Sequence, residues 1–286
     1  MKKSPLTSPA GLARGTVAGN GFYGYSGDGG PATKALVQGN DGNLYGTTAW
    51  GGANNRGTAF RMTPSGVLTS LLSFNGNNGS TPLGGLVQST NGDFYGMTSG
   101  GGTYGSGTAF RITSAGVLIN EFSLNAWYPA SSMIQASNGY LYGAATYGGN
   151  PNLNAGFGMG SVFKFALTFA SEGTLCTFGG ANGSHCVSSL VQGNDGNFYG
   201  TTAGGGAGVG PTGAGGTVFK MTPAGALTTL VSFNGANGNS PQAPLIQAGD
   251  GNFYGTTAHG GSHGGGTVFQ VTTNGVLTTL VAFGSQ

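Results

Sequence analysis

The sequence predicts an all-β fold, a β-propeller of five four-stranded blades, and three observations support this. A block with an apolar-Gln run, a tight turn and an aromatic-Gly pair occurs five times. Two shorter blocks follow each copy in the same order, and no stretch carries a helical hydrophobic period. The tyrosines of the first block set the register, because they stand 50, 47, 57 and 55 residues apart at Tyr45, Tyr95, Tyr142, Tyr199 and Tyr254.

Each repeat contains four strand candidates separated by turn residues. In the first repeat the three blocks read LVQGNDGNLYGTT at 36–48, GTAFRMT at 57–63 and GVLTSLLSF at 66–74. Asp-Gly and Asn-Gly favour tight hairpin turns, and Pro followed by Gly favours a turn at the third link. Four antiparallel strands repeated every ~50 residues describe a propeller blade. A solenoid of parallel coils ranks second, because its repeats are shorter and lack paired hairpins.

We expect one domain over residues 1–286. Residues 1–34 form an N-terminal strand and a connection, and the blades cover about 35–82, 83–130, 131–186, 187–241 and 242–286. We expect the segment from Gly15 to Ala18 to pair near the last blade and help close the ring. The alternative is six blades, one of them incomplete.

The amino-acid composition limits the classes of binding partner and the cellular compartment that we expect for this protein. Only 6% of the residues are charged and the net charge is +2, which excludes duplex nucleic acid and anionic membranes as strong partners. No apolar stretch approaches the ~20 residues needed to span a bilayer, so we expect no membrane insertion. The Thr-, Asn- and Gly-rich surface indicates a secreted or bacterial cell-surface protein, although no signal peptide is visible in this chain. We expect a monomer.

The recurring blocks resemble a known family. Q-x-x-D-G-N-F-Y-G-T-T, G-T-V-F-K-M-T and G-x-L-T-T-L are similar to the Gly-rich choice-of-anchor tandem repeats, or Gloeobacter/Verrucomicrobia repeats, of bacterial surface proteins. The segment TVAGNGFYGYSGDGGPATKA resembles the opening of NHL-type propellers. The resemblance implies an exported, often cell-anchored propeller. It implies no established activity and therefore assigns no catalytic residue.

The longer links are where we expect binding. Because strand direction alternates, the tight first and third links share one face of the disc, and the variable second and fourth links share the other. Exposed aromatic rings among Asn, Ser and Gly suit a glycan or another polymer, since rings stack on sugar C–H faces while amides bind hydroxyls. Alternatively, these rings fill the central channel. The candidates are Trp50, Tyr104, Trp127, Tyr128, Tyr147, His259 and His263, with Arg56, Phe157 and His185 beside them.

An enzymatic function is the alternative to a binding function, and the sequence favours binding. A glycosidase needs two facing carboxylates. The repeats place Asp41, Asp93, Asp195 and Asp250 in or beside the tight turns. Asp28, in YSGDGGP, is therefore the best catalytic candidate for a secreted polysaccharide hydrolase or lyase with its site at the channel mouth. A third reading is a structural scaffold or assembly protein.

The sequence contains few residues that could form a metal site or a disulfide. We expect no cofactor and no metal, with two lesser alternatives. The D-G-N turns resemble fragments of Ca²⁺ loops but supply one carboxylate each, and His259 and His263 could join His185 in a zinc site. Cys176 and Cys186 lie ten residues apart, which is compatible with a disulfide across a Gly-rich loop, or with two free thiols.

Overall fold

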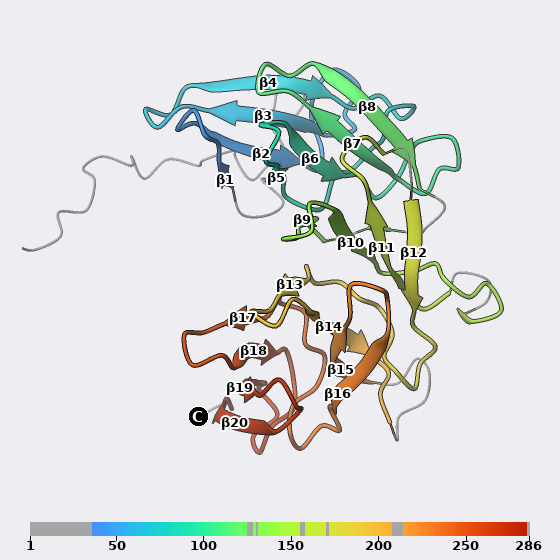
Figure 1. Ribbon diagram of the computed structural model, residues 1–286, viewed down its shortest axis with the longest axis vertical. Coiled ribbons are helices and arrows are strands. Elements are labelled where there is room, and N and C mark those ends of the chain that lie inside the picture. The colour runs from blue at the N-terminus through green and yellow to red at the C-terminus, as the bar shows by residue number, and fades with distance from the viewer. Residues whose placement is uncertain are drawn as a thin grey trace, which may run out of the picture.

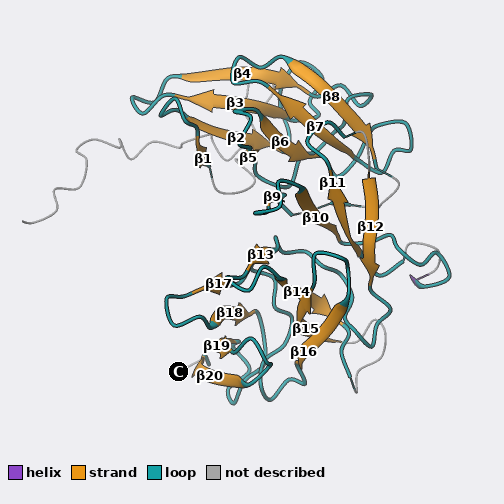
Figure 2. Ribbon diagram, viewed as in Figure 1, coloured by secondary structure: helices purple, strands orange, loops and turns teal. Residues whose placement is uncertain are grey.

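The computed structural model describes residues 36–124, 128–129, 131–154, 158–169, 172–207 and 214–284. These residues form five four-stranded antiparallel sheets, each a meander in which consecutive strands are neighbours (Figure 2). They contain no α-helix, and their one helical residue is part of a 3₁₀ turn at Asn154. The prediction of an all-β propeller with five complete blades is confirmed. The segment from Gly15 to Ala18, and with it the question of a sixth, incomplete blade, lies outside the described residues.

The strand boundaries follow the three sequence blocks. Blade 1 has β1 (Val37–Gln38), β2 (Leu44–Thr48), β3 (Thr58–Met62) and β4 (Leu68–Ser73). Blade 2 has β5 (Val87–Gln88), β6 (Phe94–Met97), β7 (Thr108–Ile112) and β8 (Leu118–Ser123). Blade 3 has β9 (Ile134–Gln135), β10 (Leu141–Ala145), β11 (Ser161–Phe165) and β12 (Glu172–Thr177). Blade 4 has β13 (Val191–Gln192), β14 (Phe198–Gly204), β15 (Ala214–Met221) and β16 (Leu227–Ser232). Blade 5 has β17 (Ile246–Gln247), β18 (Phe253–Thr257), β19 (Thr267–Val271) and β20 (Leu277–Ala282).

The blades follow one another around a common axis (Figure 1). The two-residue strands β1, β5, β9, β13 and β17 lie toward the centre, and β4, β8, β12, β16 and β20 lie on the outside. The described strands leave the arc open between blade 5 and blade 1. The described residues therefore form four seams between successive blades.

Three of the four seams bring a tyrosine ring close to a phenylalanine ring of the next blade, whereas at the seam between blades 2 and 3 Tyr95 meets Phe169 edge-to-face at 5.8 Å. The ring of Tyr45 in blade 1 stacks on Phe94 of blade 2 at 3.9 Å between centroids, and Tyr199 stacks on Phe253 of blade 5 at the same distance. Aromatic pairs of this geometry add to the burial of their apolar area. The seams together form four apolar clusters, which are the core of the molecule.

A glutamine in the inner strand ties each blade to the one before it. Gln88 Oε1 accepts a hydrogen bond from the backbone N–H of Asn40 in the first-link turn of blade 1, at 2.8 Å. Gln192 Oε1 accepts the equivalent bond from Ser137 at 2.8 Å. Gln135 and Gln247 repeat this bond at the other two seams. The apolar-Gln run of the sequence is thus an inter-blade hydrogen bond, which we call the glutamine clasp.

The glycine of the Tyr-Gly pair is required by close packing. A Cβ at Gly96 would lie 2.5 Å from Phe110 Cζ and 2.8 Å from Leu86 Cδ2. The phenylalanine of the second block thus lies flat against the glycine of the preceding strand, and only a residue without a side chain admits it. Phe110 and the tyrosine of the pair, Tyr95, are fully buried.

No helix in the described part of the chain is long and apolar enough to cross a membrane.

Candidate functional site

The face formed by the first and third links is used for structure. In the first-link turn of blade 4, Asp195 Oδ2 accepts hydrogen bonds from the Tyr199 hydroxyl at 2.8 Å and from Asn197 Nδ2 at 2.8 Å. Lys220 Nζ lies 2.9 Å from the same oxygen. In blade 2, Arg111 pairs with Asp93 at 2.6 Å. These charges neutralise one another within the turns.

The opposite face is built where the fourth link of one blade meets the second link of the next. Backbone hydrogen bonds join Ser80 to Gly100, Ser184 to Gly204 and Asn239 to His259. The residue that follows the first member of each pair carries a left-handed backbone. This left-handed residue is Thr81, His185 or Ser240 in these three links, and Tyr128 in the link between blades 2 and 3, with φ between 50° and 60°.

A left-handed backbone is unusual for residues other than glycine, and such residues cluster at functional sites. Here the main chain holds Thr81, His185 and Ser240 from both sides, and Tyr128 O accepts a hydrogen bond from Thr146 N at 3.2 Å. His185 donates its N–H to Met159 O at 2.8 Å and accepts from Ala203 N at 3.0 Å. The link therefore presents the side chain at this position in a fixed orientation. Two of the four positions carry rings, Tyr128 and His185, and these flank blade 3.

Three rings meet at this point. Tyr147, from the second link of blade 3, lies 5.8 Å from Tyr128 and 5.2 Å from His185 between ring centroids. The interplanar angles are 78° and 89°, so both contacts are edge-to-face. We call these three residues the blade 3 ring cluster. It is an aromatic surface made from two seams and one loop. The other two fourth links between described blades carry Thr81 and Ser240 at the position of Tyr128 and His185, while Trp50 and His259 stand at the position of Tyr147 in blades 1 and 5.

The ring cluster is partly open to solvent and has polar neighbours. Tyr128 is 51% exposed, whereas Tyr147 and His185 are half-buried. Burial disfavours the charged imidazole and lowers the pKa of His185 below its usual value of 6.5. Nδ1 of His185 lies 3.1 Å from the Ser184 hydroxyl. Asn150 and Asn152 are exposed in the loop that leaves Tyr147.

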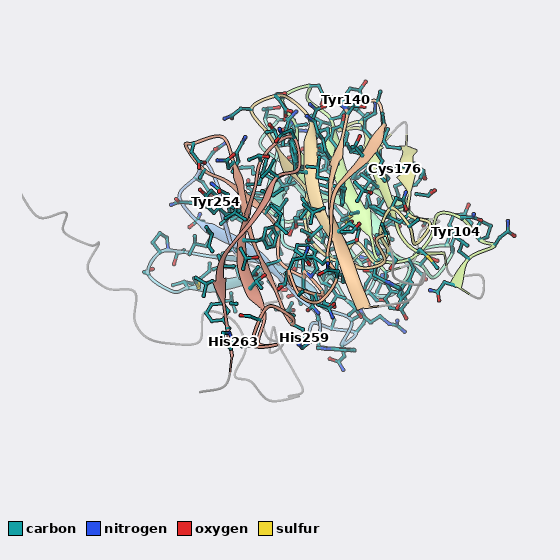
Figure 3. All side chains as sticks on the ribbon, turned by 90° about the horizontal axis from the view of Figure 1, so that it is seen from below. Tyr104, Tyr140, Cys176, Tyr254, His259 and His263 are labelled. Carbon is teal, nitrogen blue, oxygen red and sulfur yellow. The ribbon has the colours of Figure 1, made fainter. Side chains whose placement is uncertain are left out.

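The structure separates the other predicted binding residues from this cluster. Trp50 and Tyr104 are exposed by 47% and 63%, and neither contacts another ring in the described part of the chain. Figure 3 places Tyr104 far from His259 and His263, on the other side of the molecule. Trp50 and Tyr104 therefore do not belong to the blade 3 ring cluster. Trp127, Phe157 and Asp28 lie outside the described residues.

The two cysteines are not bonded to each other. Both are free thiols, so the predicted disulfide is absent. Cys186 is fully buried between blades 3 and 4, and Cys176 Sγ lies 3.4 Å from Met221 Sδ. The thiols thus behave as small apolar groups of the seam. Burial raises the pKa of Cys176 to about 11 and that of Cys186 further.

No group of three or more His, Cys, Asp or Glu side chains that could hold a metal is found among the described residues. His263 Nδ1 instead contacts the Ser262 hydroxyl at 2.9 Å.

The repeated sequence blocks match one family model. The model for the Gloeobacter/Verrucomicrobia repeat covers residues 14–153 and 119–286. The chain belongs to the Gloeobacter/Verrucomicrobia repeat family. No curated protein matches the sequence.

Solved structures show that this Gloeobacter/Verrucomicrobia repeat protein has the fold of known propeller-like proteins. A chain of the nidogen/laminin complex is 12% identical, with a TM-score of 0.54, and the match covers 88% of this chain and 81% of that one. A gluconolactonase from Xanthomonas campestris is 12% identical, with a TM-score of 0.53 and coverage of 92% and 77%. A Dyadobacter fermentans protein of unknown function is 11% identical, with a TM-score of 0.53 and coverage of 91% and 85%. At these identities the similarity concerns the fold alone.

Sequence analysis named all three residues of the ring cluster but missed their relation. Tyr128 and His185 occupy one repeat position, which alignment of the fourth links would have shown. The signal is a proline immediately after this position in three of the four links, at Pro82, Pro129 and Pro241.

Proposed function

We propose that this repeat protein is an extracellular, non-enzymatic propeller that binds a glycan or a similar polymer at the blade 3 ring cluster. The observation that supports the proposal is the convergence of Tyr128, Tyr147 and His185 from three separate links. Edge-to-face rings offer flat faces in different directions, which suits the C–H faces of successive sugar units. The exposed side chains of Asn150 and Asn152 beside them can bind the hydroxyl groups.

The expected affinity is modest. Covering half of one ring removes about 100 Å² from water, which is worth ~2.5 kcal/mol. Two such contacts, reduced by the cost of association, correspond to roughly millimolar to micromolar dissociation constants. This range suits a surface protein that holds a polymer through many copies.

The alternative of a secreted polysaccharide hydrolase or lyase remains a prediction, because its candidate Asp28 lies outside the described residues. The described aspartates Asp41, Asp93, Asp195 and Asp250 belong to the turns of the opposite face. A carboxylate pair beside the ring cluster would therefore need an acid from another part of the chain.

The test is binding of a set of soluble oligosaccharides, measured by calorimetry and by chemical-shift changes, to the unmodified chain and to Tyr147→Ala. Tyr104→Ala is the matched control, because it removes an equally large exposed ring from the same link of blade 2. We expect Tyr147→Ala to weaken binding about tenfold or more and Tyr104→Ala to leave it unchanged. Equal loss in both variants, or no binding by any of them, would overturn the proposal.

A further inference from the structure

The last blade exposes side chains that the other blades bury wholly or in part. Val281 in β20 is 44% exposed, whereas its counterpart Val231 in blade 4 is 7% exposed. Phe283 is 50% exposed, whereas Phe233 is fully buried. Tyr254 is half-buried, and the other four tyrosines at this position are fully buried. We call Tyr254, Val281 and Phe283 the blade 5 end face.

The polar groups that make hydrogen bonds across the other seams also lack these bonds in blade 5, within the described part of the chain. Gly249 stands where Asn40, Thr90, Ser137 and Asn194 donate their N–H to a glutamine clasp, and it has no such partner among the described residues. Thr256 is exposed, whereas Thr47 donates to Gly84 O at 2.8 Å across the first seam. The end face is therefore one complete half of a seam, with apolar and hydrogen-bonding groups in their usual places.

We propose that residues 14–35 of the same chain dock on the blade 5 end face and close the arc. The family model begins to match at residue 14, well before the first described strand, so repeat-type sequence continues into this segment. The segment leads directly into Leu36 at the start of blade 1, and blade 1 is the other edge of the opening (Figure 1).

The segment carries the side chains that a seam needs. A fourth link has an aromatic residue, then a Gly/Asx-rich turn, then an apolar-Gln run, and the aromatic residues Phe74, Phe178 and Phe233 are fully buried in the seams. The stretch from Tyr25 to Leu36 has the same order, with Ser26-Gly27-Asp28-Gly29 as the turn. Val17 and Phe22 supply further apolar surface for Val281 and Phe283.

Length and tethering favour this occupant over a second copy. Twenty-two extended residues reach about 70 Å, enough to cross the centre of a small domain. A tethered segment also binds at a high effective concentration. A second copy docked by its blade 1 would bring four more blades toward the place where blade 1 already stands.

The test compares deletion of residues 1–34 with deletion of residues 1–13, which keeps the proposed segment. We expect hydrogen exchange at residues 246–283 to rise at least tenfold in the longer deletion and to stay unchanged in the shorter one. Because the longer deletion also alters the flank of blade 1, each chain is then combined with Val281→Asp, which charges the end face.

Val276→Asp is the control, because Val276 is 58% exposed and its counterparts Val67 and Val117 are exposed in the same way. We expect Val281→Asp to lower the melting temperature of the full chain but to have little effect in the longer deletion. Val276→Asp should behave alike in both. Equal effects of Val281→Asp in both chains would overturn the proposal, as would a concentration-dependent dimer that Val281→Asp dissociates.

Discussion

The hydroxyl of Tyr199 donates a 2.8 Å hydrogen bond to Oδ2 of Asp195, and the same oxygen lies 2.9 Å from the Lys220 ammonium. Burial opposes the ionisation of Asp195, but the bonds from Lys220, Asn197 and Tyr199 outweigh it and hold the pKa of the carboxyl well below its usual range. A carboxyl with a depressed folded pKa stabilises the fold above its unfolded pKa and loses this contribution as the pH falls toward the folded value.

We therefore predict that Asp195→Asn destabilises the protein at pH 7 by about 1 kcal/mol, a modest amount because the pair is near the surface. The difference from the unmodified chain should shrink as the pH falls below 4. Asp250→Asn is the control, since Asp250 lies at the same repeat position and its partner is the neutral Gln270 at 3.2 Å. Melting temperatures measured between pH 3 and pH 7 check the prediction, and a larger loss in Asp250→Asn would contradict it.

The glutamine clasp gives a second prediction. Gln192→Ala removes the acceptor for the Ser137 N–H across the seam between blades 3 and 4, at a cost of about 1 kcal/mol. Gln38→Ala removes the same side chain from blade 1, where the described contact is a 3.4 Å bond to Gly42 within its own turn. Urea denaturation should show a clear loss for Gln192→Ala and a smaller one for Gln38→Ala. Equal losses would mean that the clasp adds nothing to the seam.

The sequence predicted the repeated elements well, because each is determined locally. Asp-Gly and Asn-Gly turns fix the hairpins, and the Tyr-Gly pair faces the phenylalanine of the neighbouring strand in every blade. A five-fold repetition of these local signals leaves little freedom for the sheet order. The blade boundaries themselves stay a prediction at the N-terminal side.

The candidate site was less predictable, because it depends on how neighbouring blades meet. Trp50, Tyr147 and His259 share one sequence position, yet only Tyr147 has ring neighbours in the described part of the chain. The neighbours come from the fourth links of blades 2 and 3, and their orientation depends on a left-handed backbone. The prediction of a Cys176–Cys186 disulfide was wrong for a similar reason. The spacing of the two cysteines along the chain does not show that Cys186 is buried in the seam between blades 3 and 4.

Close packing at the Tyr-Gly glycine gives a third prediction. Gly96→Ala would place a methyl group 2.5 Å from Phe110 Cζ, and relieving this overlap should cost about 1–3 kcal/mol. Gly173→Ala is the control, because a Cβ at Gly173 meets nothing within 4 Å. Thermal unfolding should separate the two variants by several degrees. A Gly96→Ala protein as stable as Gly173→Ala would show that Phe110 and Leu86 can shift to admit the methyl group without cost.

Thiol reactivity tests the correction to the disulfide. We predict that intact protein has the mass of the fully reduced chain and that Ellman's reagent reacts slowly with it, because burial raises the pKa of Cys176 to about 11 and that of Cys186 further. Denaturant should release two reactive thiols per chain. Fewer than two reactive thiols per chain, together with a mass lower by two hydrogens, would show that the disulfide forms.

The ring cluster gives the last prediction, through His185. Burial lowers the pKa of His185 in the folded protein, whereas in the unfolded chain the group titrates near 6.5. Above 6.5 both states are neutral and the fold keeps its full stability. As the pH falls below 6.5 the unfolded chain takes up the proton first, so stability declines until the folded pKa is reached.

His185→Gln should therefore flatten the dependence of the free energy of unfolding on pH between 7 and 5. His259→Gln, which changes an exposed histidine, should keep the decline. Chemical denaturation at intervals of half a pH unit checks both variants, and a decline of the same size in His185→Gln would place its origin outside the ring cluster.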